Sequence, residues 1–159
     1  MPTVYFLCGM PTSGKTTLAK KLAAEQDAQR FTLDERMISK HDYSIDDEEY
    51  GPLAAQEKML MWEEAQLFLT DSRNVVLDWS LWSRAARAEW TQRVLAAGYG
   101  YKLFYLDVPL DRLKQRATVR NADTNAIVHF ISLEELDRFS HIFQPPSLDE
   151  NLNFEVISS

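Results

Sequence analysis

Short apolar runs alternate with longer amphipathic stretches along the whole chain. Apolar runs at residues 4–8, 30–33, 75–78 and 103–107 are rich in β-branched and aromatic side chains, which is typical of buried strands. A weaker run covers residues 153–157. Strands that alternate with helices predict a parallel sheet covered by helices on both faces. We therefore expect a single α/β domain over residues 1–159, with a five-stranded parallel sheet.

The stretches between these runs have the spacing of amphipathic helices. Helices are expected to begin at Lys15 and after Ser44, Ser83, Pro109 and Ser132, because serine caps and first-turn prolines are common helix starts. Gly98 suits the end of the third of these helices. The second is long, and its predicted apolar face consists of Leu53, Leu60, Met61, Ala65 and Phe68.

Composition narrows the class of protein. The 159 residues are 45% hydrophobic, enough for one core, and the net charge of −7 gives no support to nucleic-acid binding or to an anionic membrane surface. The only cysteine, Cys8, excludes an internal disulfide. There is no apolar stretch of about 20 residues and no pattern of a secretory signal. We expect a cytoplasmic protein.

Residues 9–16 match the pattern G-x-x-x-x-G-K-[ST] between a predicted strand and a predicted helix. Glycines let consecutive backbone N–H groups point at phosphate oxygens, and the helix start adds its positive end. The Lys15 ammonium then reaches the β and γ phosphates, and the Thr16 hydroxyl can bind Mg²⁺. The predicted nucleotide-binding residues are Gly9, Met10, Pro11, Thr12, Ser13, Gly14, Lys15, Thr16 and Thr17.

Two aspartates stand where strands end, and the ligand crevice of a parallel sheet lies at that edge. Asp34 follows the second strand and precedes Arg36, a candidate substrate contact. Its carboxylate could accept the proton of an attacking hydroxyl, or it could cap a helix. Asp78 ends the third strand and could hold Mg²⁺, directly or through water, or bind substrate.

The segment after Asp78 has an unusual composition. Trp79, Trp82 and Arg84 lie within seven residues of one another and suit an acceptor pocket that covers a ring or a sugar. Core packing of one or both tryptophans is the alternative, and both readings stay open at this point.

Three arginines, Arg112, Arg116 and Arg120, are spaced four apart along one predicted helix. Phosphoryl transfer gathers negative charge that arginines stabilise. Arg116 and Arg120 precede a polar break and suit a short lid over the phosphates, at about residues 116–126. Arg112 is expected on the solvated face of that helix.

Missing motifs exclude other nucleotide-binding classes. The chain has no Asn-Lys-x-Asp guanine reader, no Asp-x-x-Gly switch and no Leu-Ser-Gly-Gly signature, so GTPases and ABC-type ATPases are excluded. A ring-forming AAA+ motor needs a longer chain. A compact phosphotransferase remains.

With these motifs, the chain resembles the small P-loop kinases known as AAA-type predicted kinases. That group includes the kinase domain of phage polynucleotide kinase, chloramphenicol phosphotransferase and the zeta-toxin sugar kinases. The resemblance covers roughly residues 3–146 and rests on the phosphate loop, Asp34, the Val-Val-Leu-Asp strand with Arg84 downstream, and Tyr-Leu-Asp-Val-Pro leading to Arg116 and Arg120.

The resemblance implies a P-loop kinase fold and roles for particular residues. Asp34 would activate the acceptor hydroxyl, and Arg116 and Arg120 would stabilise the transferred phosphoryl group. Residues 144–146 would lie beside the adenine.

We therefore expect an ATP-dependent kinase that uses Mg²⁺ and phosphorylates a hydroxyl of a small molecule such as a sugar, a nucleoside or an antibiotic. The alternatives are a polynucleotide 5′-hydroxyl kinase and a nucleotide-binding regulatory module with little turnover. Whether the protein is a monomer or a dimer stays open.

Overall fold

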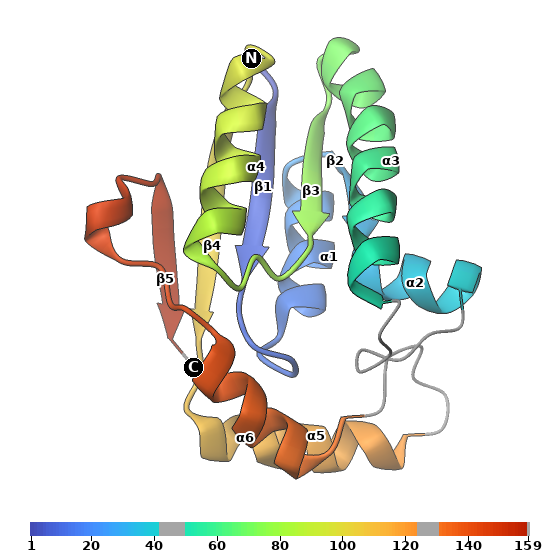
Figure 1. The fold of residues 1–159 in the computed structure, drawn as a ribbon. Helices are drawn as coiled ribbons and strands as arrows, with labels where there is room; N and C mark the ends of the chain where they lie inside the picture. The colour runs from blue at the N-terminus through green and yellow to red at the C-terminus, as the bar shows by residue number, and fades with distance from the viewer. Residues whose placement is uncertain (42–49, 124–130, 159) are drawn as a thin grey trace.

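The computed structural model describes residues 1–41, 50–123 and 131–158 (Figure 1). The strands of these ranges are β1 (Thr3–Cys8), β2 (Ala28–Thr32), β3 (Asn74–Asp78), β4 (Gly100–Asp107) and β5 (Phe154–Ser158). The helices are α1 (Lys15–Glu25), α2 (Leu33–His41), α3 (Tyr50–Thr70), α4 (Arg84–Ala96), α5 (Leu110–Ala122), α6 (Leu133–Ile142) and the short 3-10 helix η1 (Leu148–Glu150).

The sheet has the order β2-β3-β1-β4-β5 and is parallel throughout. β1 lies at its centre, with Phe6 in register with Leu77 of β3 on one side and with Leu103 of β4 on the other. The chain first builds the β3 side of β1 and then the β4 side. In open parallel sheets such a reversal opens a ligand crevice at the carboxyl ends of the strands. The expected five-stranded parallel sheet is confirmed.

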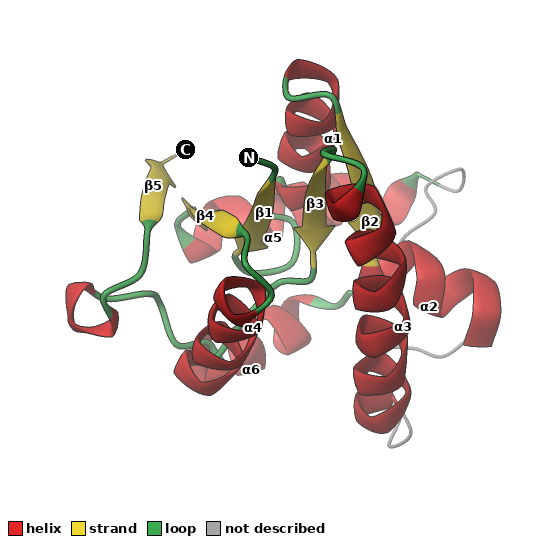
Figure 2. Cartoon of the chain, turned by 90° about the horizontal axis from the view of Figure 1, so that it is seen from above, coloured by secondary structure: helices red, strands yellow, loops and turns green. Residues whose placement is uncertain are grey.

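Helices lie on both faces of this sheet, as predicted. Figure 2 shows α3 and α4 together on one face and α1 on the opposite face. The core under α3 and α4 includes Phe6, Leu77, Trp79 and Trp90, and Leu7 belongs to a smaller cluster under α1. α5 and α6 cross the carboxyl ends of the strands (Figure 1) and share their own apolar cluster. α5 and α6 therefore cover the edge of the sheet where the ligand crevice is expected.

Two local expectations need correction. β2 ends at Thr32, so Asp34 belongs to the first turn of α2 and does not directly follow a strand. The buried face of α3 includes Trp62 and Leu69, whereas Leu60 is 39% exposed. The Trp62 ring packs edge-on against Trp90 of α4 at 6.4 Å, and this contact rotates the buried stripe away from Leu60.

Other start and stop signals match the structure. Ser83 Oγ accepts a hydrogen bond from the Ala86 N–H at 3.0 Å, and Ser132 forms a capping box with Glu135. Gly98 has φ +91°, in the left-handed region that favours glycine. The expected helix start at Ser44 lies outside the described residues, as does the lid beyond Asp123. Within the described ranges, no helix is long and apolar enough to cross a membrane.

A buried arginine ties the C-terminal segment to the rest of the fold. Arg87 of α4 has no exposed side-chain surface, and its Nε and Nη2 donate to the two carboxylate oxygens of Glu150 at 2.9 and 3.1 Å. Its Nη1 donates to the Leu81 carbonyl at 3.0 Å. The Glu150 side chain is only 6% exposed. Burial acts to raise the pKa of Glu150, but the hydrogen bonds from Arg87 and from the Ser147 N–H, together with the charges of Arg87 and Arg84, lower it overall.

Glu150→Gln is expected to destabilise the protein by about 3 kcal/mol at pH 7, because it leaves the Arg87 charge buried without a counter-charge. The folded-state pKa of Glu150 lies below its ordinary value of 4.5, so this stabilisation is present above that value and is lost as the pH falls through the folded-state pKa. Urea unfolding at several pH values should show the wild-type advantage shrinking in acid. Asp149→Asn, at the exposed ion pair with Arg84, is the control and should change unfolding little.

Candidate nucleotide and acceptor site

The predicted phosphate loop joins β1 to α1, and its glycines are required by geometry. Gly14 stands at the N-cap of α1 with φ +100°. A Cβ on Gly9 would lie 2.7 Å from Ser13 Oγ, which is too close for any real contact. The loop therefore curls tightly enough to present its backbone N–H groups at the start of α1, where the helix end is positive.

Lys15 is folded back against the loop. Its Nζ donates to the Met10 carbonyl at 2.8 Å, and burial lowers the pKa of Lys15 while the Asp78 and Asp34 carboxylates raise it. The ammonium is thus held in a nearly dry position at the loop, where phosphate oxygens would be strong partners.

Oxygen ligands suited to Mg²⁺ converge next to Lys15. Thr16 Oγ1 donates to Asp78 Oδ2 at 3.1 Å, and Thr32 Oγ1 lies 3.5 Å from the same oxygen. Burial raises the pKa of Asp78, while the nearby Lys15 lowers it. In the described part of the chain, no three His, Cys, Asp or Glu side chains gather as a metal cluster. A hydroxyl and a carboxylate fit a Mg²⁺ ion that completes its shell with phosphate oxygens and water.

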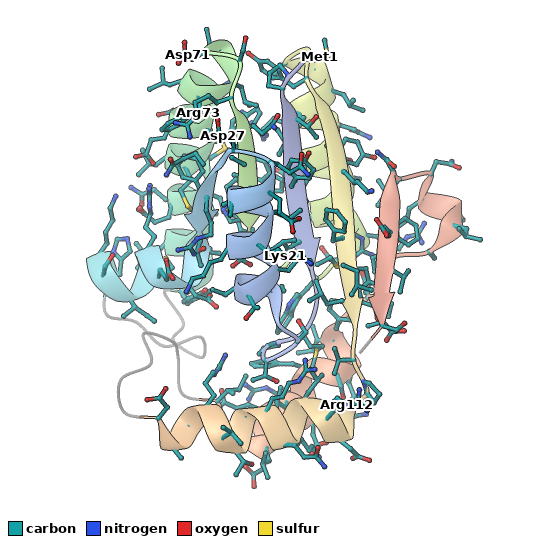
Figure 3. The ribbon with its side chains drawn as sticks, turned by 180° about the vertical axis from the view of Figure 1, so that it is seen from behind. Met1, Lys21, Asp27, Asp71, Arg73 and Arg112 are labelled. Atoms are coloured by element: carbon teal, nitrogen blue, oxygen red, sulfur yellow. The ribbon has the colours of Figure 1, made fainter. Side chains whose placement is uncertain are left out.

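Arginines of α5 reach this loop from the opposite side. Arg116 Nη1 donates to the Ser13 carbonyl at 3.1 Å and to the Thr12 carbonyl at 3.4 Å. Arg120 also lines the cavity; burial lowers its pKa, and the Asp34 charge raises it. Arg112 is exposed at the start of the same helix (Figure 3). Of the two predicted lid arginines, Arg116 therefore contacts the loop and Arg120 lines the cavity, whereas Arg112 is exposed.

A cavity of about 1110 Å³ is lined by the phosphate loop and by two further groups of residues, which we distinguish as two arms by the elements that carry them. One arm is bounded by Leu18, Lys21, Leu106 and Ile157, from α1, β4 and β5. The other arm runs toward α2, α3 and α4, and its lining includes Asp34, Tyr50, Ala54, Lys58, Trp79 and Trp90. We name these the base arm and the acceptor arm.

Asp34 stands where the acceptor arm meets the phosphate loop. Its side chain is exposed to the cavity, and Tyr50 Oη lies 3.4 Å from Asp34 Oδ1 as a donor. Burial raises the pKa of Tyr50, and the Asp34 charge adds to this effect. The Asp34 charge also raises the pKa of Lys15 and of Arg120, which agrees with its position close to both groups.

The segment after β3 forms the wall between the loop and α4. Ser80 and Leu81 have φ of +71° and +35°, values that non-glycine residues rarely adopt. This backbone is held by hydrogen bonds: the Gly9 N–H lies 3.4 Å from the Ser80 carbonyl, and Trp82 Nε1 donates to the Gly9 carbonyl at 3.1 Å. Cys8 Sγ donates to the Leu81 carbonyl at 3.3 Å, and burial raises the pKa of this thiol to about 11.

The sequence left open whether Trp79 and Trp82 pack in the core or line a pocket. In the structure each does both. Trp79 is 2% exposed and meets the Trp90 ring edge-on at 4.6 Å, yet it also lines the cavity. Trp82 is half-buried, packs against Phe139 of α6 at 5.0 Å and lines the cavity as well.

Several predicted site residues lie elsewhere. Arg36 forms an ion pair with Glu64 of α3, and Arg84 forms a two-point ion pair with Asp149 at 3.0 Å. Neither arginine belongs to the cavity lining. Gly9 and Met10 lie behind the loop, and the lining begins at Pro11.

The segment 144–146 is also outside this lining. The Gln144 N–H donates to the Trp82 carbonyl at 2.9 Å, and Gln144 Oε1 accepts from the Arg84 N–H at 2.9 Å. The segment therefore packs at the start of α4. The base arm instead lies beside the end of β5.

Sequence reasoning missed four residues of this region: Thr32, Tyr50, Lys58 and Arg87. Thr32 ends β2 beside β3, where its position next to Asp78 follows from the register. A threonine at the carboxyl end of a predicted parallel strand could therefore have been included among the predicted site residues. The other three are polar residues on helices. From the sequence alone, such residues are expected on the solvent-exposed face of the helix.

The chain matches the AAA domain family AAA_33 over residues 4–146 and belongs to that family. No curated protein is significantly similar to it in sequence. The resemblance to AAA-type P-loop kinases is thereby confirmed at the level of the family.

Solved structures share the fold at low sequence identity. A gluconokinase from Sinorhizobium meliloti 1021 is 19% identical, with a TM-score of 0.66 over 99% of this chain and 82% of its own. Kti12 of Chaetomium thermophilum, solved with ADP-AlF3, is 14% identical, with a TM-score of 0.71 over 98% and 88%. A chain of the Pnkp1/Rnl/Hen1 RNA repair complex is 20% identical, with a TM-score of 0.71 over 88% and 43%. The chain therefore has a P-loop kinase-like fold.

Lys15→Met is expected to remove nucleotide binding without lowering the stability of the free protein. The substitution deletes a buried, desolvated ammonium that donates to the Met10 carbonyl, so the free protein should melt at the same temperature or higher. Wild type should gain about 2.7 kcal/mol from ATP-Mg²⁺ at 100 times the Kd, and the variant should gain little. Thermal denaturation with and without ATP-Mg²⁺ measures both effects. Lys20→Met, on the exposed side of α1, is the control, and a full thermal shift in Lys15→Met would contradict the assignment.

Proposed function

We propose that the protein is an ATP-dependent kinase that transfers the γ-phosphate to a hydroxyl group of a small molecule. One observation carries this proposal: Asp34 opens onto the same cavity as the phosphate loop, at the junction with the acceptor arm. A hydroxyl placed in that arm would find a carboxylate on one side and the end of a bound triphosphate on the other.

The nucleotide would occupy the phosphate loop and the base arm. Residues 11–17 would cradle the phosphates, with Lys15 and Arg116 as their cationic partners. Leu18, Leu106 and Ile157 supply apolar surface for a base. The missing guanine reader favours ATP over GTP. Thr16 and Asp78 would hold Mg²⁺, which supplies positive charge at the β and γ phosphates.

Transfer requires a proton acceptor and charge stabilisation. Asp34 would take the proton of the acceptor hydroxyl while the hydroxyl oxygen forms a bond to the γ-phosphorus. The bond from that phosphorus to the bridging oxygen breaks, and ADP leaves with the electron pair. Lys15, Arg116 and Arg120 would stabilise the charge on the transferred group and the leaving oxygen.

The walls of the acceptor arm support a small acceptor. Its lining is largely apolar and includes Ala54 and Met59 of α3, Ala86 and Trp90 of α4, and Trp79 of the segment after β3. The net charge of −7 gives little support to polynucleotide binding, which depends on phosphate-neutralising cations. Because a chain of an RNA repair complex shares the fold, the experiment below also tests for polynucleotide kinase activity.

A pooled metabolite extract incubated with the protein and ATP-Mg²⁺, followed by mass spectrometry, tests the proposal directly. A metabolite that gains one phosphate supports a small-molecule kinase. ATP binding without any phosphorylated product would favour a regulatory module. Tight oligonucleotide binding that weakens steeply between two salt concentrations would favour a polynucleotide kinase.

Asp34→Asn is expected to lower kcat by about 100-fold to 10,000-fold, because the amide cannot accept the hydroxyl proton. The KM for ATP should stay near that of wild type, since Asp34 forms no hydrogen bond or ion pair with the phosphate loop in the described residues. Glu35→Gln is a matched control: Glu35 is the adjacent carboxylate and pairs with Arg30 at 3.3 Å. Steady-state kinetics on the identified acceptor gives both constants. Unchanged turnover in Asp34→Asn would remove Asp34 as the base.

Arg120→Ala is expected to lower kcat by about 100-fold or more through lost charge stabilisation in the transition state, while Arg112→Ala should change it little. Both arginines lie on α5, but only Arg120 lines the cavity. Equal effects of the two substitutions would show that α5 acts through general electrostatics rather than through contact with the transferred group.

A further inference from the structure

The acceptor arm contains a lysine that has no hydrogen-bond or ion-pair partner among the described residues. Lys58 of α3 lines the cavity one turn after Ala54. In the described residues 1–41, 50–123 and 131–158, no hydrogen bond and no ion pair within 4.0 Å involves its ammonium. Within these ranges, the cavity therefore holds a cation that no carboxylate contacts.

Three glutamates near Lys58 form ion pairs with other cations. Glu35 pairs with Arg30 at 3.3 Å, and Glu89 pairs with Arg93 at 3.2 Å along α4. Glu57, which precedes Lys58 in α3, is buried and bound to Lys40 at 3.0 Å. These acids lie close to Lys58 in sequence or in the cavity, yet each has another cation in contact.

The environment of Lys58 favours a charged ligand. Burial lowers the pKa of Lys58, whereas the charges of Glu89 and Asp34 raise it. Ala54 and Ala86 leave room beside it, and Trp79 and Trp90 restrict water on the inner side. A partly desolvated ammonium without a contacting anion is unfavourable, and an oxyanion that enters with a ligand relieves this cost.

We infer that the acceptor is a small hydroxyl compound that carries an oxyanion, a carboxylate or a phosphate, and that Lys58 binds this group. The inference rests on the proposed kinase function. The hydroxyl would face Asp34 at the phosphate loop, and the oxyanion would lie farther along the arm toward α3. A neutral polyol would leave the ammonium uncompensated, and a cationic acceptor would be repelled by it.

The test begins with the products that wild type forms from the metabolite extract, sorted by whether the acceptor is anionic or neutral. For the best anionic acceptor and its neutral analogue, kcat/KM is then measured in wild type, Lys58→Met and Lys58→Arg. D-glycerate, glycerol 3-phosphate and glycerol form a defined set that separates carboxylate from phosphate. Lys20→Met serves as the control for loss of an exposed lysine.

We expect wild type to prefer anionic acceptors, and Lys58→Met to lose about 10-fold to 100-fold in kcat/KM for them, as for a lost hydrogen bond to a charged group. The neutral analogue should be unaffected, Lys58→Arg should recover most of the preference, and the KM for ATP should not change.

Three outcomes would overturn this inference. Phosphorylated neutral acceptors with no response to Lys58→Met would remove the oxyanion site and leave the kinase function intact. Phosphorylation confined to 5′-hydroxyl oligonucleotides would replace the small acceptor by a polynucleotide. A wild-type protein that binds ATP-Mg²⁺ and phosphorylates nothing would overturn the kinase function and this inference with it.

Discussion

The Lys15 ammonium, bound to the Met10 carbonyl under the phosphate loop, is the constraint on which the site depends. A buried cation at the positive end of α1 creates strong positive potential at one point of the sheet edge. Burial lowers the pKa of Lys15, the charges of Asp78 and Asp34 act to raise it, and the Arg120 charge acts to lower it further. The triphosphate of the proposed nucleotide would supply negative charge at this point.

Topology brings the other groups to the same point. β1 is central, and the strand order changes direction there, so residues that follow β1, β2, β3 and β4 meet at one edge of the sheet. Thr16, Thr32 and Asp78 come from three successive βα units, and the hydroxyl of each threonine lies within 3.5 Å of the Asp78 carboxylate. α5 closes this edge and carries Arg116 onto the loop.

The acceptor side is built from contacts that are separate from the phosphate loop. The backbone of Ser80 and Leu81, with positive φ, is held by Arg87, whose charge is compensated by Glu150 from the C-terminal segment. The walls themselves come from α3 and α4. The nucleotide side is thus dictated by a local motif, while the acceptor side depends on how two helices and the chain end pack.

The sequence by itself determined the strands, the phosphate loop, most helix ends and the α5 arginines that face the loop, because these follow from periodicity and from backbone requirements such as the positive φ of Gly14. Only the tertiary structure decided which charged side chains enter the cavity. Arg36 and Arg84 pair with Glu64 and Asp149 away from it, whereas Lys58 lines it. A long charged side chain takes its partner from distant segments, and one-dimensional spacing carries no information about that choice.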